Sequence, residues 1–370
     1  MNLGLIIYGR LSTLSGGYLY DRKLVEYLRQ AGDEVDIISL PWRWYGRHLT
    51  HNFSRTLYRQ LCAAPYDVLL QDELNHPSLF WLNRRLHGRI HYPIISIVHH
   101  LRSSEQHPVW ANWLYRQIER RYLASVDGFV FNSETTRQVV HGLLAKRPFH
   151  ELPFTKRPFT VAHPAGDQFQ PNFDPAHILA RAHEPGPLRV LFVGNLIPRK
   201  NLHVLLAALA QLPLANWRLT VVGNTAVSPR YTRTIHQQIH QQHLQNNVTL
   251  LGPLADAQVA AQMAQSHLLA VPSSYEGFGI VYLEGMGFAL PAIAGSGGAA
   301  HEIITAGVNG FLVGGIAELA QQITTLQQDR NRLAQMGLAA WQHYQAHPTW
   351  HDTGARIHQF LHEIKNARLS

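Results

Sequence analysis

Two glutamates are the residues of this sequence whose spacing most directly suggests chemistry. Glu276 and Glu284 lie in PSSYEGFGIVYLEGMGFALPAIAGSGGAAHEII, residues 272–304, where glycines flank Phe278 and a helix is expected to begin near Ile280. The first amides of a helix lack intrahelical acceptors and lie at the positive end of its dipole, so they can hold a diphosphate. Carboxylates accept hydrogen bonds from sugar hydroxyls. The segment predicts a site for a sugar diphosphate; a helix entry with incidental surface carboxylates is the alternative.

A second segment carries cations that suit the phosphates. In VLFVGNLIPRKNLHVLLAAL, residues 190–209, an expected strand is followed by a glycine, a short loop with Arg199 and Lys200, and a helix. Open α/β sheets bind phosphate where strands end and helices begin. The pattern predicts that Lys200 lies at the phosphates, and a solvated basic loop is the alternative.

The charge of the chain is divided along the sequence. Its 32 Lys+Arg and 24 Asp+Glu give a formal charge of +8. Residues 185–255 contain six basic and no acidic residues, whereas residues 256–329 contain six acidic residues and no Lys or Arg. A nucleic-acid surface keeps its basic residues together without an acidic counterpart, so this separation argues against nucleic acid as a partner. It favours an anion site with separate carboxylates for neutral hydroxyls.

Motifs for metals and cofactors are missing from the sequence. It has no Asp-x-Asp, no zinc spacing, no GxGxxG and no Walker lysine motif, so we expect neither metal nor cofactor. The single Cys62 can form neither an internal disulfide nor a thiolate metal site. No window approaches the ~18 apolar residues of a membrane span. Because the amino end also turns polar too early for a signal peptide, we expect a cytoplasmic protein.

Around Glu276 and Glu284 the sequence resembles the retaining glycosyltransferases of family 4, which have the GT-B fold. Their mark is two glutamates separated by seven residues around a Gly-Phe-Gly turn, here residues 277–279. The resemblance implies that Glu276 contacts donor-sugar hydroxyls and that Glu284 binds the ribose of the nucleotide. It also implies that three backbone amides approach the sugar and phosphate, those of Phe278, Gly279 and Ile280.

The loop before residue 200 also matches the family, with one departure. The family reads Gly-Arg-Leu, three variable residues and then Lys; Lys200 matches the lysine, but Asn195 stands at the arginine. Arg199 is the candidate for the missing phosphate cation.

The amino-terminal half extends the resemblance. Gly16 and Gly17 are expected beneath the donor phosphates, although glycines are common in such turns. The family places a sugar-binding histidine after the strand expected at 94–98, where His99 fits and His100 is the alternative. Either histidine could instead simply cap the strand.

The motifs and the resemblance together assign three groups of residues. The predicted catalytic residues are Glu276, His99 and Lys200. The predicted donor-binding residues are Gly16, Gly17, Asn195, Arg199, Lys200, Leu254, Glu276, Gly277, Phe278, Gly279, Ile280 and Glu284. The predicted acceptor-binding residues are Asp72, Glu73, Asn75, His76 and His100, whose side-chain types fit many polyols.

The elements that must position these residues follow from hydrophobic periodicity. Buried-strand patterns occur in two series, first at 3–8, 35–40, 68–70, 94–98 and 128–131, then at 188–193, 219–222, 248–251, 268–271, 291–294 and 310–313. Helical patterns between them predict parallel sheets. The expected fold class is α/β with two Rossmann-like domains, and the resemblance implies that they face each other across a cleft.

Composition sets the expected domain boundaries. We predict an acceptor-binding domain at 1–168, a linker at 169–187 and a nucleotide-sugar-binding domain at 188–345. A C-terminal helix at 346–370 is expected to pack back on the first domain. The linker is placed where Pro, Gly and polar residues are frequent.

A basic and aromatic stretch remains outside these assignments. Residues 37–66 contain no acid, arginines and His51 recur every four residues from 47 to 59, and leucines and Phe53 recur with an offset of two. This spacing predicts an amphipathic helix, for which packing on the sheet is favoured. Contact of residues 41–61 with an anionic membrane is the hypothesis kept beside it.

The sequence therefore predicts a metal-independent retaining glycosyltransferase. It would move a sugar from a UDP- or GDP-linked donor to a hydroxyl of a polysaccharide, glycolipid or small glycoside, in the cytoplasm or at the inner face of the membrane. A sugar-nucleotide epimerase of the same fold and an inactive nucleotide-sugar-binding subunit are the alternatives. A phosphorylase lacks support, because no lysine marks its cofactor site.

Overall fold

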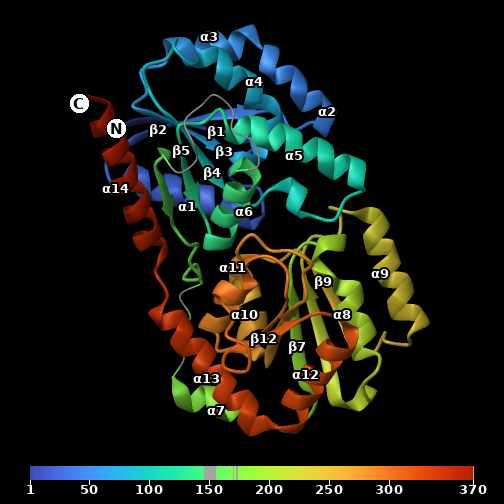
Figure 1. Cartoon of the computed structure of the whole chain (residues 1–370). Coiled ribbons are helices and arrows are strands. Elements are labelled where there is room, and N and C mark those ends of the chain that lie inside the picture. Colours follow the sequence, from blue (N-terminus) through green and yellow to red (C-terminus); the bar gives the residue numbers. More distant parts are fainter. Residues whose placement is uncertain (146–155, 170, 172–173, 370) are drawn as a thin grey trace. The chain divides into compact units, whose positions relative to one another are not determined.

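The chain forms two compact α/β units in its computed structural model, which describes residues 1–145, 156–169, 171 and 174–369. The first unit joins Met1–Pro164 to Trp350–Ser370, and the second is Ala165–Thr349. Within the described residues each unit contains one six-stranded sheet (Figure 1). The prediction of two Rossmann-like domains is therefore confirmed.

The sheet of the first unit is parallel and has the order β2-β1-β3-β4-β5-β6. Its strands are β1 (Asn2–Tyr8), β2 (Glu34–Leu40), β3 (Val68–Asp72), β4 (Ile94–Val98), β5 (Gly128–Phe131) and β6 (Phe159–Val161). The central strands β3, β4 and β5 are buried at every position, as parallel strands covered on both faces should be. The sequence missed β6, because this short edge strand has no buried residue to mark it.

Helices cover both faces of this sheet. On one face α1 (Gly16–Gln30) packs against α14 (Trp350–Leu369). On the other, α3 (Arg55–Ala63), α4 (His76–Leu86) and α5 (Val109–Leu123) share a hydrophobic core with β1 and β4. The remaining elements are α2 (Tyr45–His48), α6 (Glu134–Ala145) and the short 3₁₀ turns η1 (Leu49–Phe53), η2 (Glu73–Asn75) and η3 (Arg102–Ser104).

The single amphipathic helix expected around residues 47–61 is wrong. Helical structure is interrupted at Ser54, whose backbone is extended with ψ 110°. The Ser54 Oγ accepts a hydrogen bond from the Leu57 amide at 3.2 Å. Serine is a preferred N-cap, so α3 starts anew there. Leu57 and Leu61 face the core, whereas Phe53 is exposed.

The second unit has a parallel sheet of order β12-β11-β10-β7-β8-β9. Its strands are β7 (Leu188–Val193), β8 (Trp217–Val222), β9 (Val248–Gly252), β10 (Leu268–Val271), β11 (Ala292–Gly295) and β12 (Gly310–Val313). Its helices are α7 (Pro175–Ala182), α8 (Leu202–Leu209), α9 (Pro229–Gln241), α10 (Asp256–Gln265), α11 (Ile280–Gly287), α12 (Ile316–Gln328) and α13 (Arg330–Ala346), with 3₁₀ turns η5 (Pro198–Lys200), η6 (Leu214–Asn216) and η7 (Ala299–Glu302). All six strands of this sheet overlap the sequence prediction.

The stretch predicted as a linker, 169–187, belongs to the second unit where the structure describes it. Its helix α7 packs against α13. Arg181 on α7 is buried and donates hydrogen bonds to the carbonyls of Phe288 and Ala289, at 2.7 and 3.0 Å. Residues 170 and 172–173 of this stretch lie outside the described residues. The Pro and Gly residues at its ends obscured the amphipathic helix between them.

The C-terminal helix α14 packs on the first unit. The ring of Trp350 lies 5.8 Å from that of Tyr20. Thr353 Oγ1 donates to the carbonyl of His163 at 2.6 Å. Lys365 Nζ forms an ion pair with Asp67 at 2.9 Å. These contacts start at Trp350, slightly later than the predicted boundary at residue 346.

Candidate functional site

An ion cluster of Arg199, Lys200 and Glu276 forms the centre of the candidate site in the second unit. The two cations lie in η5, between β7 and α8, and Glu276 lies in the loop after β10. Lys200 Nζ is 2.6 Å from Glu276 Oε1, and Arg199 Nη1 is 3.3 Å from Glu276 Oε2. Arg199 also donates to the carbonyl of Tyr275 at 2.6 Å. Two segments that are far apart in the sequence thus meet at one point.

The backbone of Glu276 is held by the glycine-rich segment after β11. Its carbonyl accepts a hydrogen bond from the Ala299 amide at 2.8 Å. Gly298 has φ +79°, and a Cβ at this position would come within 2.1 Å of the Glu276 carbonyl oxygen. A side chain at residue 298 would therefore be strained and would displace the loop. This explains why the glycines near residue 298 accompany the two glutamates.

Burial and neighbouring charge separate the pKa values of the two glutamates. Burial would raise the pKa of Glu276, but the charges of Lys200 and Arg199 outweigh it and lower that pKa to about 2. Burial raises the pKa of Glu284 to about 7, with Asp256 adding to the shift and Lys200 opposing it. Glu276 is therefore ionised at neutral pH, whereas Glu284 titrates near neutrality. Burial also lowers the pKa of Lys200, against the attraction of Glu276.

Helix α11 begins where the sequence predicts and carries Glu284 one turn in. Its N-cap is Gly279, with φ +103°. Gly277 and Phe278 are buried, and the Phe278 ring is part of the hydrophobic core. The aromatic side chain therefore anchors the turn that leads into α11, and the first amides of a helix are groups that can bind an anion.

Asn195 and Leu254 complete the predicted donor residues of this unit. Asn195 follows β7, is half-buried, and its carbonyl accepts a hydrogen bond from the Ile197 amide at 2.9 Å. The second cation beside Glu276 is Arg199; the neutral Asn195 occupies the position where the family has an arginine. Leu254 follows β9, is half-buried and packs against the hydrophobic core. Donor contacts of both residues stay predictions.

His99 forms the centre of a second cluster, in the first unit. It follows β4, and its Nε2 lies 3.1 Å from Oδ1 of Asp21 on α1. Gly17, one turn earlier on α1, lies against the ring, since a Cβ there would be 3.2 Å from His99 Cδ2. Burial would lower the pKa of His99, but Asp21 and Asp72 outweigh it and the pKa rises to about 9. His99 is thus a cation at neutral pH. Gly16 is the first residue of α1.

Asp72 is the last residue of β3 and Glu73 follows it; both belong to the same cluster and are buried. Burial raises the pKa of each to about 7; Asp21 adds to the shift of Asp72, whereas His100 and His99 oppose that of Glu73. Near neutral pH each carboxyl can therefore donate or accept a hydrogen bond.

Asn75 and His76 lie beneath these carboxyls and already bind protein groups. Asn75 Nδ2 donates to two backbone carbonyls, at 3.2 and 3.3 Å. His76 Nδ1 is 3.1 Å from Glu73 Oε1, and its Nε2 is 3.0 Å from the Tyr45 hydroxyl. Burial lowers the pKa of His76 to about 4. This geometry gives both residues supporting positions; direct contact with an acceptor stays a prediction.

The sequence missed two buried acids of this cluster. Asp21 pairs with His99, and Glu119 accepts a hydrogen bond from the Ser103 amide at 3.0 Å. Asp21 lies one helical turn after Gly17, a spacing that could have revealed it. Nothing local marks Glu119, which lies within α5. His100, the alternative histidine, is half-exposed and lies 3.0 Å from Glu105 Oε1.

Three groups of side chains in the described part of the chain bring potential metal ligands together. They are Asp21, Asp72 and His99; Glu73, His76 and Glu119; and Asp33, His358 and His362. Metal binding requires a neutral imidazole, which the raised pKa of His99 disfavours in the first group. In the second group both ring nitrogens of His76 already face protein partners. Metal independence stays a prediction.

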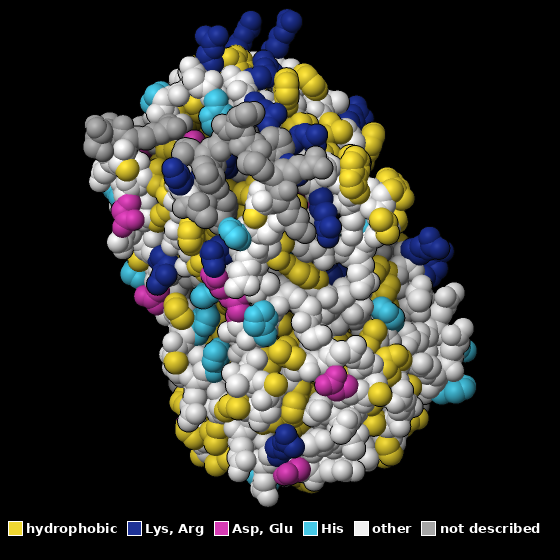
Figure 2. Space-filling view, viewed as in Figure 1, with side chains coloured by type: hydrophobic (Ala, Val, Ile, Leu, Met, Phe, Trp, Pro, Cys, Tyr) yellow, Lys and Arg dark blue, Asp and Glu magenta, His cyan; other side chains and the backbone are white. Residues whose placement is uncertain are grey.

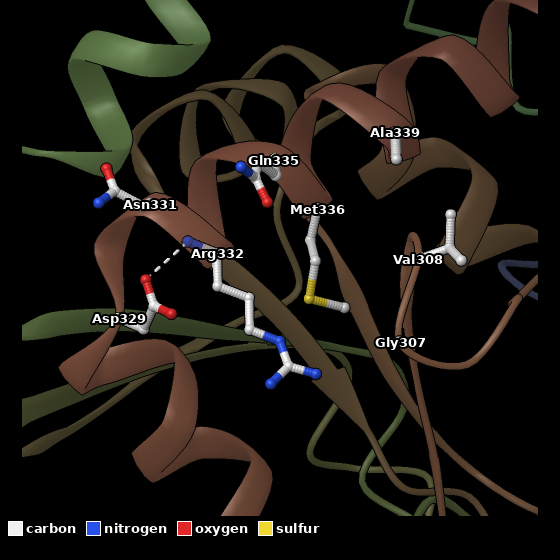
Figure 3. Close-up of a pocket in the computed structure, with 8 residues that line it drawn as sticks. All are labelled: Gly307, Val308, Asp329, Asn331, Arg332, Gln335, Met336 and Ala339. Carbon is white, nitrogen blue, oxygen red and sulfur yellow. Dashed lines mark hydrogen bonds between the residues drawn. The ribbon is translucent and has the colours of Figure 1, made fainter.

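A cavity of about 570 Å³ lies elsewhere in the second unit, at the start of α13 (Figure 3). Its lining includes Asp329, Arg332 and Met336. The Asp329 carboxylate accepts a hydrogen bond from the Arg332 amide at 2.9 Å and caps the helix. The Arg332 guanidinium lies over the Phe311 ring at 5.5 Å. The cavity contains none of the predicted site residues.

Comparison with known proteins identifies relatives over much of the chain. The glycosyl transferases group 1 family model matches residues 177–343. The GDP-mannose-dependent alpha-(1-6)-phosphatidylinositol monomannoside mannosyltransferase of Mycobacterium tuberculosis is 29% identical over 190 residues, 48% of each chain. The D-inositol 3-phosphate glycosyltransferase of Nocardia farcinica is 27% identical over 310 residues, 77% of this chain and 67% of the relative. The match to the mycobacterial protein spans about half of that protein's length.

Solved structures resemble the whole chain. Sucrose-phosphate synthase of Thermosynechococcus elongatus has a TM-score of 0.81 at 19% identity, covering 99% of both chains. HepE of Anabaena in complex with UDP and glucose has a TM-score of 0.75 at 21% identity, covering 98% of this chain and 100% of that one. These likenesses show the GT-B fold. Among the helices that the structure describes, none has the length and apolar character that crossing a membrane requires.

Proposed function

We propose that the chain is a glycosyl transferase of group 1 and that it moves a sugar from a nucleoside diphosphate to an acceptor hydroxyl. One observation carries this proposal: Arg199 and Lys200 converge on Glu276, in the loop that leads into the amino end of α11. Cations, free helix amides and a carboxylate are the groups that a sugar diphosphate needs. The donors that suit this site are UDP- or GDP-linked sugars.

Each residue of the site has a role in this reaction. Glu276 accepts hydrogen bonds from sugar hydroxyls, for which its low pKa keeps it ionised. Lys200 and Arg199 stabilise the charge that develops as the diphosphate leaves. Glu284, with a pKa of about 7, can donate or accept at the ribose.

We place the reaction in family 4, with retention of configuration and without a metal. The bond from the anomeric carbon to the diphosphate breaks, and a bond from that carbon to the acceptor oxygen forms on the same face. The leaving diphosphate oxygen takes the acceptor proton, so no side chain need act as a strong base. Lys200, Arg199 and the amides of α11 supply positive charge that a metal would otherwise bring.

The acceptor is proposed to bind at the first unit. Asp21, Asp72 and Glu73 surround His99 without a lysine among them, which suits a neutral polyol part of a saccharide, glycoside or lipid-linked sugar. Location in the cytoplasm or at the inner face of the membrane stays part of the proposal.

The inactive-subunit alternative rests on Asn195 at the usual arginine position. Arg199 weakens that argument, because it brings a second cation to 3.3 Å from Glu276. The epimerase alternative has no specific support in the geometry.

A screen of UDP- and GDP-linked sugars for slow hydrolysis by the full chain tests the proposal. We expect release of UDP or GDP with one sugar, and faster release when the acceptor is added. The anomeric configuration of the product, read by NMR, distinguishes retention from inversion. No release from any donor, with nucleotide binding intact, would favour the inactive subunit.

A further inference from the structure

Tryptophans are exposed over one part of the first unit. Five of the chain's eight tryptophans are exposed, and all five lie between residues 42 and 113: Trp42, Trp44, Trp81, Trp110 and Trp113. Trp44 and Trp110 leave 71% and 72% of their surface open. Phe53, Val109 and Leu114 are exposed beside them. In the described part of the second unit the exposed large hydrophobic side chains are aliphatic. This concentration of exposed tryptophans indicates an interaction site, because large exposed apolar clusters mark such sites.

The elements that carry these side chains pack against one another. The Trp81 amide of α4 donates to Asn52 Oδ1 of η1 at 2.8 Å. Tyr45 of α2 contacts Tyr115 of α5 edge to face, with ring centroids 4.7 Å apart. Helix α4 also packs along α5, and Figure 1 shows α2, α4 and α5 together on one side of the sheet. The elements that carry the exposed aromatic residues therefore lie together on one side of the sheet.

The part of the chain that carries these aromatic residues also has exposed arginines and no exposed acid. Residues 41–123 are all described and contain seven exposed arginines: Arg43, Arg47, Arg55, Arg59, Arg89, Arg116 and Arg121. Each acid within the same residues is buried or half-buried. Figure 2 shows dark blue and yellow side chains interspersed on the part of the surface over α2, α4 and α5. The surface thus combines positive charge with exposed aromatic and aliphatic groups, and we name it the aromatic-arginine face.

We propose that the aromatic-arginine face docks the protein onto an anionic lipid membrane. Tryptophan rings favour the headgroup level of a bilayer, and arginines are attracted to anionic headgroups. Along α5, Trp110, Trp113 and Leu114 follow one another on a single helix face, as in helices that lie in a membrane interface. Val109 and Leu114 add aliphatic groups, which insert into lipid but offer no ring for stacking a nucleic-acid base.

This proposal goes beyond the membrane contact predicted from the sequence. That prediction covered residues 41–61, in which the expected helix is broken. The structure adds α4 and α5, whose tryptophans lie far outside that segment. Docking stands independently of catalysis, so it holds whether or not the transfer reaction is the one proposed.

Co-sedimentation of the full chain with vesicles tests the docking. One vesicle contains phosphatidylcholine alone and the other an equal mixture with phosphatidylglycerol, both at low salt. An aromatic variant combines Trp110→Ser with Trp113→Ser, and a charge variant combines Arg47→Gln with Arg59→Gln. The matched control combines Arg230→Gln with Arg233→Gln, two exposed arginines of α9 in the second unit. Circular dichroism verifies that each variant is folded.

We expect the chain to sediment with the anionic vesicles and to be released by salt. The charge variant should bind roughly tenfold or more weakly, since each arginine near an anionic surface contributes about fivefold. The aromatic variant should also bind more weakly, and the control should bind like the unaltered chain.

Three results would overturn the docking proposal. The first is no sedimentation of the unaltered chain at low salt. The second is full binding by the aromatic variant, which would indicate a surface for polyanions in general. The third is a single-stranded oligonucleotide that binds the face and displaces the vesicles at lower concentration. If the aromatic variant fails to fold, the charge variant and its control still decide.

Discussion

The two units handle buried charge in opposite ways. In the second unit, two cations face Glu276 and hold its pKa at about 2, so the ions are fixed at neutral pH. In the first unit, Asp72 and Glu73 are buried with pKa values raised to about 7 around a protonated His99. Fixed cations suit a diphosphate, whereas carboxyls near their titration point suit neutral hydroxyls. The buried side chains of the two units thus differ in protonation, which is the difference that the proposed donor and acceptor sites require.

Among the variants, removal of Lys200 should cause the largest loss of donor turnover. Lys200→Ala deletes the cation nearest Glu276, and donor turnover should fall on the order of 10²- to 10³-fold, as for the loss of one group that stabilises developing charge. Nucleotide release from the sugar donor is the measurement. Lys156→Ala, an exposed lysine of the first unit, is the matched control and should keep full turnover. An equal loss of turnover in Lys200→Ala and Lys156→Ala would show that Lys200 has no specific role at the site.

The two glutamates should differ in what they contribute to folding. Glu276→Gln leaves Lys200 and Arg199 without their carboxylate and should lower the free energy of unfolding by about 3 kcal/mol, because breaking a partly buried ion pair strands its cations. Glu284→Gln should cost less at pH 6, where the native carboxyl is mostly protonated already. Urea denaturation of both variants measures the difference. The opposite order would contradict the pKa assignment.

Stability should depend on pH through the buried carboxyls. A carboxyl with a raised pKa keeps its proton longer in the folded state, so stability falls as pH rises between the unfolded and folded pKa values. For Glu284 this interval runs from 4.5 to about 7, and Asp72 and Glu73 act in the same direction. We expect a smaller loss of stability across it in Glu284→Gln than in the unaltered chain. Identical pH slopes in a denaturation series would show that Glu284 is not shifted.

Asp21 should position and charge His99. In Asp21→Asn the partner that raises the pKa of His99 is removed, so that pKa should fall from about 9 towards the ordinary value. The histidine ring signals in an NMR titration report it, and the alkaline limb of a turnover profile should move in the same direction. Gln30→Asn, an exposed residue at the end of α1, is the control. An unchanged His99 titration would show that Asp21 has no such role.

The smallest effect is expected from Gly17. Gly17→Ala would place a methyl group 3.2 Å from His99 Cδ2, which the ring can relieve by a shift of a few tenths of an ångström. Turnover should fall only a few-fold, without loss of folding. Gly142→Ala, with open space around its Cβ position, is the control and should leave turnover unchanged. Full turnover of Gly17→Ala would show that the ring position tolerates the shift.

The contacts of the candidate site in the second unit were easier to predict from the sequence than those in the first, for a physical reason. Glu276, Glu284 and Lys200 lie in two contiguous segments, where strand, turn and helix signals accompany the chemistry. Asp21 and His99 are 78 residues apart and meet only in the folded unit; the spacing from Gly17 indicates which face of α1 carries Asp21, but not that His99 is its partner. The central strands were readable because parallel strands covered on both faces are mostly apolar.

The sequence patterns also missed the helix interruption at Ser54 and the exposed tryptophans of α4 and α5. Ser54 interrupts the predicted helix because its capping preference outweighs a periodicity that continues across it. The tryptophans of α4 and α5 form part of the aromatic-arginine face only once those helices pack beside η1 and α2, which the sequence does not show. Local patterns thus predicted elements and missed the contacts between them.

Isothermal titration of the full chain with GDP and with UDP shows whether a nucleoside diphosphate binds at Arg199, Lys200 and Glu276. We expect saturable binding of at least one nucleotide at one site per chain. Lys200→Ala should abolish this binding and Lys156→Ala should retain it. Absence of binding by either nucleotide, or equal binding by Lys200→Ala, would contradict a nucleoside diphosphate site at Arg199, Lys200 and Glu276.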